Sequence, residues 1–66
     1  MPVSQKCKTT ALQLLSKYYG DTTATLYGAY YEKREDRAVK ESVRELLSEM
    51  VGVDRAEKEM QAFRNV

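Results

Sequence analysis

Residues 39–50 read VKESVRELLSEM, and this stretch decides the fold class. Its apolar side chains recur at spacings of four and three residues, which is the period of one face of an α-helix. They are Val39, Val43, Leu46, Leu47 and Met50. The side chains between them are mostly charged, as is typical of the exposed face of such a helix. The stretch therefore predicts an amphipathic helix over residues 36–51, which Gly52 ends.

The same period occurs near the N-terminus. The apolar residues that share one helical face there are Val3, Cys7, Ala11, Leu14 and Tyr18. Ser4 is a suitable N-cap, because its hydroxyl can accept a hydrogen bond from a free backbone N–H group of the first turn. Gly20 is suited to the left-handed conformation that often follows a helix. These features predict a helix over residues 4–19.

Two further helices are predicted on weaker grounds. Residues 22–33 carry threonines and Gly28, which have low helix propensity, so packing or a partner must stabilise a helix there. Residues 54–64 begin with the spacing of a capping box, in which Asp54 replaces the usual Ser or Thr and Glu57 is the second member. The apolar row of this last helix consists of Ala56, Met60 and Phe63.

The four segments together predict a single all-α domain over residues 1–66, a small bundle of three to four short helices. One alternative stays open, because no proline or glycine lies between Ala29 and Val51. The second and third helices could therefore be one long helix. We favour a break between them, since six consecutive charged residues at 32–37 interrupt the apolar pattern.

The apolar supply for a core is small. The chain has 66 residues and a net charge of +1, with six Leu, six Val and one Phe but no Ile or Trp. A domain of this size buries only about 60% of the surface of its unfolded chain. One cysteine cannot form an internal disulfide, and the remaining common way to stabilise so small a core is oligomerisation. We therefore expect a homo-oligomer, with a homodimer as the simplest form.

Composition argues against catalysis. The chain has no histidine, so it lacks an imidazole base and the usual zinc or haem ligand. Its three glycines are too few and too dispersed for a loop that binds phosphate. The single thiol, Cys7, falls on the apolar row of its helix and is expected to be buried. We expect no enzyme activity, no metal and no cofactor.

The expected compartment is the cytoplasm. The sequence begins MPVSQKCKTT, which has no apolar segment of the kind found in signal peptides. A membrane-spanning helix needs about 20 mainly apolar residues, and no stretch of this chain provides them. A lone cysteine also fits a reducing compartment.

The tyrosines give the main indication of function. All five lie between residues 18 and 31, in the half of the chain with few charges. Tyrosine is favoured at interfaces, where its ring is buried and its hydroxyl remains hydrated. The residues predicted to bind a partner protein are Leu12, Leu15, Tyr19, Tyr27 and Tyr31. The open alternative is that tyrosines fill the core in place of Ile and Trp, which we expect for Tyr18 and Tyr30 more than for Tyr27 and Tyr31.

These observations predict a small non-catalytic interaction module, such as an adaptor, regulator or chaperone-like subunit, whose partner is another protein. The alternative is a dimeric, helix-turn-helix-like nucleic-acid-binding protein, with residues 23–31 in the major groove. Two observations count against it. The sequence pI is about 7.8, below the value above 9 typical of DNA-binding domains, and residues 23–31 contain no Arg, Asn or Gln to read bases.

Overall fold

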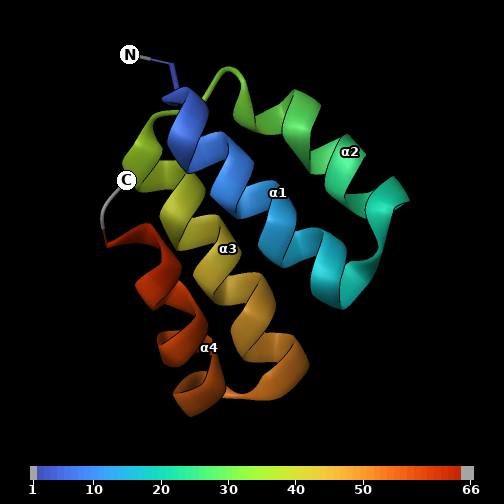
Figure 1. Cartoon of the computed structure of the whole chain (residues 1–66), viewed down its shortest axis with the longest axis vertical. Helices are drawn as coiled ribbons and strands as arrows, with labels where there is room; N and C mark the ends of the chain where they lie inside the picture. Colours follow the sequence, from blue (N-terminus) through green and yellow to red (C-terminus); the bar gives the residue numbers. More distant parts are fainter. Residues whose placement is uncertain (1, 65–66) are drawn as a thin grey trace.

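The computed structural model describes residues 2–64, which form four α-helices and, within that range, no β-strand (Figure 1). The helices are α1 (Gln5–Tyr19), α2 (Asp21–Tyr31), α3 (Asp36–Val51) and α4 (Val53–Met60), and α4 continues into a 3₁₀ turn, η1 (Gln61–Phe63). The predicted all-α bundle of short helices is confirmed. The predicted boundaries coincide with the observed ones at both ends of α3 and at the end of α1, and elsewhere differ by one to four residues.

The second and third predicted helices are separate. Residues 32–35 form a turn, in which the backbone N–H of Arg34 donates to the carbonyl of Tyr31 at 2.9 Å. Glu35 then adopts an extended conformation and precedes the first residue of α3. The break falls in the charged run, whose side chains have no apolar face to bury and remain exposed at residues 32–35.

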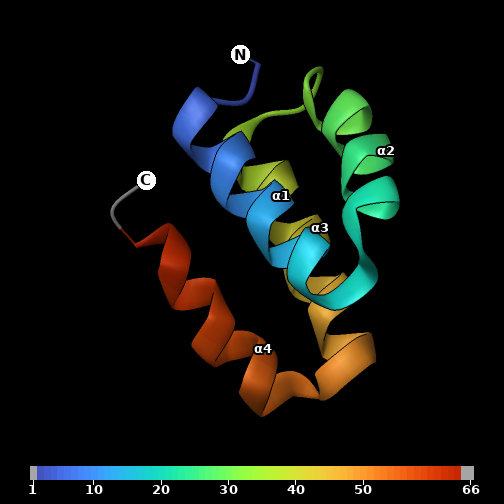
Figure 2. The ribbon, with the colours of Figure 1, turned by 45° about the vertical axis from the view of Figure 1, so that its right-hand side comes forward.

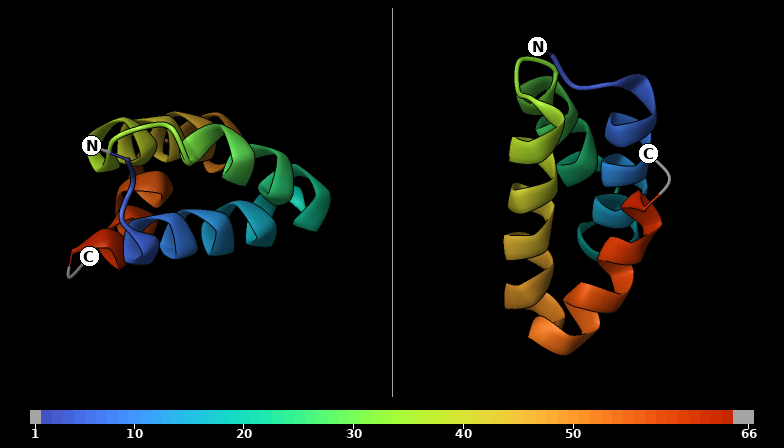
Figure 3. Two further views of the ribbon diagram at one scale, coloured as in Figure 1. Left: turned by 90° about the horizontal axis from the view of Figure 1, so that it is seen from above. Right: turned by 90° about the vertical axis from the view of Figure 1, so that its left-hand side faces the viewer.

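The four helices form two helical hairpins. α1 and α3 lie side by side at the centre, α2 packs on α1, and α4 packs on α3. α2 and α4 therefore flank the central pair on opposite sides (Figures 1 and 2). Seen from above, α1 and α3 lie in separate layers, and α2 and α4 lie toward opposite ends of the molecule (Figure 3). This arrangement leaves one long side of α2 without a neighbouring element among residues 2–64.

The core lies between α1 and α3. Its largest fully buried side chains are Tyr31, Leu15, Leu47, Val39, Val43 and Cys7. Tyr31 reaches the core from the end of α2, and its hydroxyl lies 2.8 Å from the hydroxyl of Ser42 in α3. Burial of the ring raises the pKa of Tyr31 above its ordinary value. One tyrosine thus supplies core volume that Ile or Trp would supply in a sequence with more large apolar residues.

The two hairpins repeat the same local structure at a constant offset of 32 residues. A single glycine joins each helix pair, with φ 95° and ψ 163° at Gly20 and φ 90° and ψ 162° at Gly52. Only glycine adopts this conformation readily, because it has no Cβ. Each glycine N–H donates to the carbonyl of a serine four residues earlier, Ser16 or Ser48, at 3.0 Å. Each glycine carbonyl accepts from the N–H of an alanine four residues later.

The buried positions repeat with the same offset. Five pairs of equivalent residues are buried in both hairpins: Cys7 and Val39, Ala11 and Val43, Leu15 and Leu47, Ala24 and Ala56, and Tyr31 and Phe63. The chain is therefore a pseudo-symmetric pair of helix–glycine–helix units that share one core. This internal repeat makes the outer faces of α2 and α4 directly comparable.

Candidate protein-interaction surface

The outer face of α2 is apolar and exposed. Leu26 is 69% exposed and Tyr30, one turn later, is 51% exposed. Thr22 and Ala29 lie on the same side of the helix and are exposed as well. These four residues are called the α2 outer face below. The face lies opposite the side through which α2 packs on α1.

Small residues bring α2 close to α1. Ala24 and Gly28 are buried on the inner side of the helix. A Cβ atom placed on Gly28 would lie 3.2 Å from Cδ1 of Leu12, which is tighter than an ordinary contact. The glycine therefore allows a close approach of the two helices. This packing stabilises a segment whose composition alone disfavours a helix.

An aromatic cluster holds Tyr30 in place. The rings of Tyr27 and Tyr30 meet edge to face with centroids 6.5 Å apart, and the ring of Tyr31 lies 5.6 Å from that of Tyr27 and 5.7 Å from that of Tyr30. The Arg34 guanidinium lies 4.5 Å from the centroid of the Tyr30 ring. Aromatic and cation–π contacts each contribute about 0.5–1 kcal/mol at such sites. Tyr30 is therefore oriented by its neighbours although it is exposed.

The charges of this region lie at the two ends of α2. Residues 22–31 carry none, whereas Asp21 begins the helix and the exposed Glu32, Lys33, Arg34 and Glu35 follow its last residue. The Asp21 carboxylate accepts a hydrogen bond from the hydroxyl of Ser16. The result is an uncharged strip with an acidic residue at one end and charges of both signs at the other.

The outer face of α4 has a different chemistry. At the positions equivalent to Thr22, Leu26, Ala29 and Tyr30, the second hairpin carries Asp54, Lys58, Gln61 and Ala62, all exposed. Beside them, the Arg44 guanidinium pairs with Glu57 at 2.5 Å, which adds to the charged character of this side. The hairpin architecture therefore folds with a polar outer face, and it does not require the apolar face seen on α2.

The five residues predicted to bind a partner do not form one surface. Leu15 and Tyr31 are 0% exposed and belong to the core, which corrects the prediction for both. Leu12 is half-buried and lines a groove of about 570 Å³ between α1 and α2, together with Ala24 and Thr25. Tyr27 is half-buried in the aromatic cluster. Only part of the predicted surface is accessible.

Tyr19 is half-buried on the inner side of the bundle. Its hydroxyl donates to the carbonyl of Leu46 in α3 at 2.6 Å. Burial, followed by the negative charge of Glu49, raises the pKa of this tyrosine. Tyr19 thus joins the two central helices, and its hydroxyl is used in a hydrogen bond within the chain.

The expected division of the tyrosines between core and surface is corrected at two positions. Tyr30 was expected in the core and is exposed, whereas Tyr31 was placed on the surface and is buried. The smallest residues, Ala24 and Gly28, decide the orientation of α2, and Tyr31 lies on their side of the helix. Leu26 and Tyr30 were therefore missed as surface residues. Comparison of the two repeats would have identified them, because a lysine and an alanine occupy the equivalent positions.

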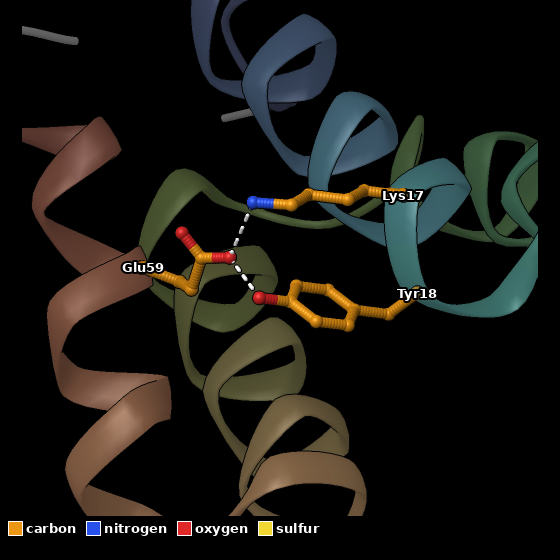
Figure 4. A network of polar contacts seen from close by, with 3 residues as sticks. All are labelled: Lys17, Tyr18 and Glu59. Atoms are coloured by element: carbon orange, nitrogen blue, oxygen red, sulfur yellow. Dashed lines mark hydrogen bonds and ion pairs between the residues drawn. The ribbon is translucent and has the colours of Figure 1, made fainter.

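A polar network links the last turn of α1 to α4 and so joins the two hairpins (Figure 4). One oxygen of Glu59 in α4 accepts from the Lys17 ammonium at 3.0 Å and from the Tyr18 hydroxyl. These hydrogen bonds, that of Tyr18 first, hold the pKa of Glu59 below its ordinary value. Tyr18, which was also expected in the core, is half-buried with its side chain packed against the core, and its hydroxyl makes this link.

Comparison of the chain with protein-family models, curated proteins and solved structures finds no match. In residues 2–64, every helix is too short or too polar to cross a bilayer. The same range brings together no group of three or more Cys, Asp or Glu side chains that could hold a metal ion. The local geometry of the chain is therefore the basis for its proposed function.

Proposed function

We propose that this chain is a small non-catalytic protein–protein interaction module, which binds through the α2 outer face. The observation that carries the proposal is the contrast between two equivalent positions: Leu26 is 69% exposed on α2, and a lysine, Lys58, occupies that position on α4. Single exposed apolar residues are common on protein surfaces. A contiguous apolar strip on one of two repeated units is a stronger indication of an interface.

The chemistry of the face suits a protein partner. Leu26 offers apolar area, and Tyr30 combines a large ring with a hydroxyl that can remain hydrated. Tyrosine is enriched among the interface residues that contribute most to binding. Because Tyr27, Tyr31 and Arg34 already orient the Tyr30 ring, binding costs less side-chain entropy than it would for a free side chain.

The position of the only thiol supports a non-catalytic role. Cys7 is fully buried in α1. Burial, followed by the charge of Asp36, raises its pKa, which keeps the thiol protonated and weakly nucleophilic. Within this proposal the chain acts in the cytoplasm as an adaptor, a regulator or a chaperone-like subunit.

Nucleic-acid binding has less support. In a helix-turn-helix reading, α2 would enter the major groove with its outer face. That face presents Thr22, Leu26, Ala29 and Tyr30, none of which is among the side chains that pair in bidentate fashion with base edges.

A differential capture experiment tests the proposal. The full chain, its Leu26→Asp variant and its Lys58→Asp variant are each used as bait in extracts of the native host, and bound proteins are quantified by mass spectrometry. We expect proteins that the wild type and Lys58→Asp retain equally and that Leu26→Asp loses at least tenfold. A set of captured proteins unchanged by Leu26→Asp would contradict the proposal. Circular dichroism of the three baits checks that they fold alike.

A further inference from the structure

We propose that the turn over residues 32–35 is a hinge through which two copies of this chain exchange their helical hairpins. In the exchanged dimer α2 and α3 join into one helix, and the α1–α2 unit of each copy packs on the α3–α4 unit of the other. The exchange uses only the inner surfaces of the units. It therefore goes beyond the proposed function and does not depend on the α2 outer face.

Each helix–glycine–helix unit needs a partner unit to fold. The units cover residues 5–31 and 36–63, and each is shorter than the roughly 40 residues below which a chain rarely folds alone. Both contribute to one core, in which Leu15 and Leu47, at equivalent positions, are 0% exposed. A unit supplied by a second copy offers the same inner surface as the unit of the same chain. The core therefore does not determine which copy supplies the partner unit.

The polar contacts between the units can form equally well between two copies. The hydroxyl of Tyr31 lies 2.8 Å from that of Ser42, and the Tyr19 hydroxyl donates to the carbonyl of Leu46 at 2.6 Å. The Glu59 network also joins one unit to the other. Exchange re-forms each of these contacts between the copies. The balance between monomer and dimer is therefore set by the hinge and by the protein concentration.

The hinge contains no residue that prevents a helix. Residues 32–35 read EKRE, without proline or glycine, and Glu, Lys and Arg are among the better helix formers. All four side chains are exposed, so straightening the turn uncovers no core residue. The hydrogen bond from the Arg34 N–H to the Tyr31 carbonyl would be replaced by the regular bonds of a helix. Arg34 would remain one helical turn from Tyr30, so their contact is compatible with the straight form.

The charges of residues 32–37 oppose the straight form and so favour the monomer. Residues three and four apart are neighbours on a helix, where like charges are destabilising. In a continuous helix this run would contain four like-charged pairs at these spacings and one pair of opposite charge, Lys33 with Asp36. The like-charged pairs are Glu32 with Asp36, Lys33 with Arg37, Glu32 with Glu35, and Arg34 with Arg37.

Two polar contacts beside the hinge also favour the monomer. The Lys8 ammonium pairs with Glu32 at 2.7 Å, and the backbone N–H of Ser4 donates to the Asp36 carboxylate at 2.6 Å. Units joined by a short linker meet at an effective concentration of about 1 mM. The wild type should therefore be mostly monomeric below about 1 mM, with the exchanged dimer as its minor form.

A complementation experiment tests the exchange. Leu15→Asp places a charge in the core from the first unit and Leu47→Asp does so from the second, so each full chain alone should be unfolded. In an equimolar mixture, the intact first unit of one variant can pair with the intact second unit of the other. The stability of so small a core and the effective concentration of the linked units together predict pairing in the low micromolar range, so about 100 µM suffices.

We expect this mixture to regain about half of the wild-type helical signal in circular dichroism, because one intact pair of units forms for every two chains. Sedimentation should show a species of twice 7.6 kDa. A signal equal to the mean of the two separate variants would overturn the inference. Recovery of helix by Leu47→Asp alone would also overturn it, because two first units would then pair with each other.

The variant Arg37→Glu tests the hinge. Arg37 is exposed, and the substitution changes its pairs with Lys33 and Arg34 in a continuous helix from like to opposite charge. Its ion pair with Glu41 lies within α3 and is lost in the monomer and the dimer alike. The matched control is Arg64→Glu, which changes the net charge equally at an exposed position outside the hinge.

Each protein is unfolded in urea, refolded at concentrations up to about 1 mM and studied by sedimentation equilibrium. We expect the dissociation constant of the Arg37→Glu dimer to be at least tenfold lower than that of the wild type, because four like-charged pairs per dimer become favourable. Arg64→Glu should dimerise like the wild type. Association of Arg37→Glu no tighter than that of Arg64→Glu would overturn the role of the hinge.

Discussion

Leu26 and Lys58 occupy equivalent positions in the two helix–glycine–helix units, and each is exposed on the outer face of its helix. The two units share five pairs of buried positions and nearly identical glycine connections. The outer face of α2 is uncharged and exposes Leu26 and Tyr30, whereas that of α4 carries Asp54, Lys58, Gln61 and Ala62, with the exposed Val53 beside it. Since the fold accommodates both chemistries, folding alone does not explain the apolar face of α2, and we propose that the face binds a partner.

Replacement of Leu26 by lysine should leave the fold intact. The side chain is mostly exposed, and surface substitutions usually change stability by less than about 0.5 kcal/mol. We expect Leu26→Lys to unfold in urea like the wild type when both are compared at a concentration low enough to exclude self-association. A loss of about 2 kcal/mol would place Leu26 among the residues that stabilise the monomer and would contradict its assignment as a surface residue.

The side chain at position 28 should control the spacing of α1 and α2. Gly28→Ala gains up to about 1 kcal/mol of helix propensity, offset by the shift that its Cβ demands of Leu12. We expect a stability within about 1 kcal/mol of the wild type. Gly28→Leu cannot be accommodated by the half-buried Leu12 and should lose about 1–3 kcal/mol, measured by urea unfolding. Equal stability of the two variants would contradict the close approach.

Truncation of Leu15 should unfold much of the population. Leu15 of α1 is fully buried in the core, and Leu→Ala substitutions in cores cost about 2–5 kcal/mol. A single core of this size rarely supplies more than about 3–5 kcal/mol. Circular dichroism at 25 °C should show a large loss of helix for Leu15→Ala. The matched variant Leu26→Ala should keep its helical signal, since position 26 lies outside the core.

The link between the hairpins should make stability fall in acid. The pKa of Glu59 is lower in the folded chain than its ordinary value of 4.5, because the Tyr18 hydroxyl and then Lys17 donate to the carboxylate. The stabilisation is therefore complete above about pH 4.5 and is lost as the pH falls through the lowered pKa. Glu32, whose pKa is lowered by Lys8, contributes in the same direction.

The variant Glu59→Gln isolates this contribution. Its melting temperature should fall less steeply than that of the wild type as the pH is lowered from about 5 to about 3, because position 59 no longer binds a proton. Near neutral pH the variant should be the less stable of the two. If the melting temperatures of both proteins fell equally with pH over this range, the Glu59 network would not stabilise the fold.

The sequence was sufficient for the helices and insufficient for the orientation of α2. In α3 a single apolar row repeats every three or four residues, so the buried face follows from the spacing. In α1 the predicted row is buried at Cys7, Ala11 and Leu14, but Leu15, which lies outside it, is buried as well. In α2 apolar residues lie on two sides, Ala24, Gly28 and Tyr31 on one and Leu26 and Tyr30 on the other. Spacing cannot choose between two apolar sides. The choice depends on how closely α2 can approach α1, and small residues rather than large ones allow that approach.

Site-specific photo-crosslinking in the native host tests the central claim most directly. A photoreactive benzoylphenylalanine is placed at position 26 of the full chain, or at position 58 as the equivalent position of the second hairpin. The account predicts strong covalent adducts from position 26 and at most weak ones from position 58, whether the captured protein is a second copy or another partner. Adducts of equal yield from both positions, or from position 58 alone, would contradict the assignment of the α2 outer face as the binding surface.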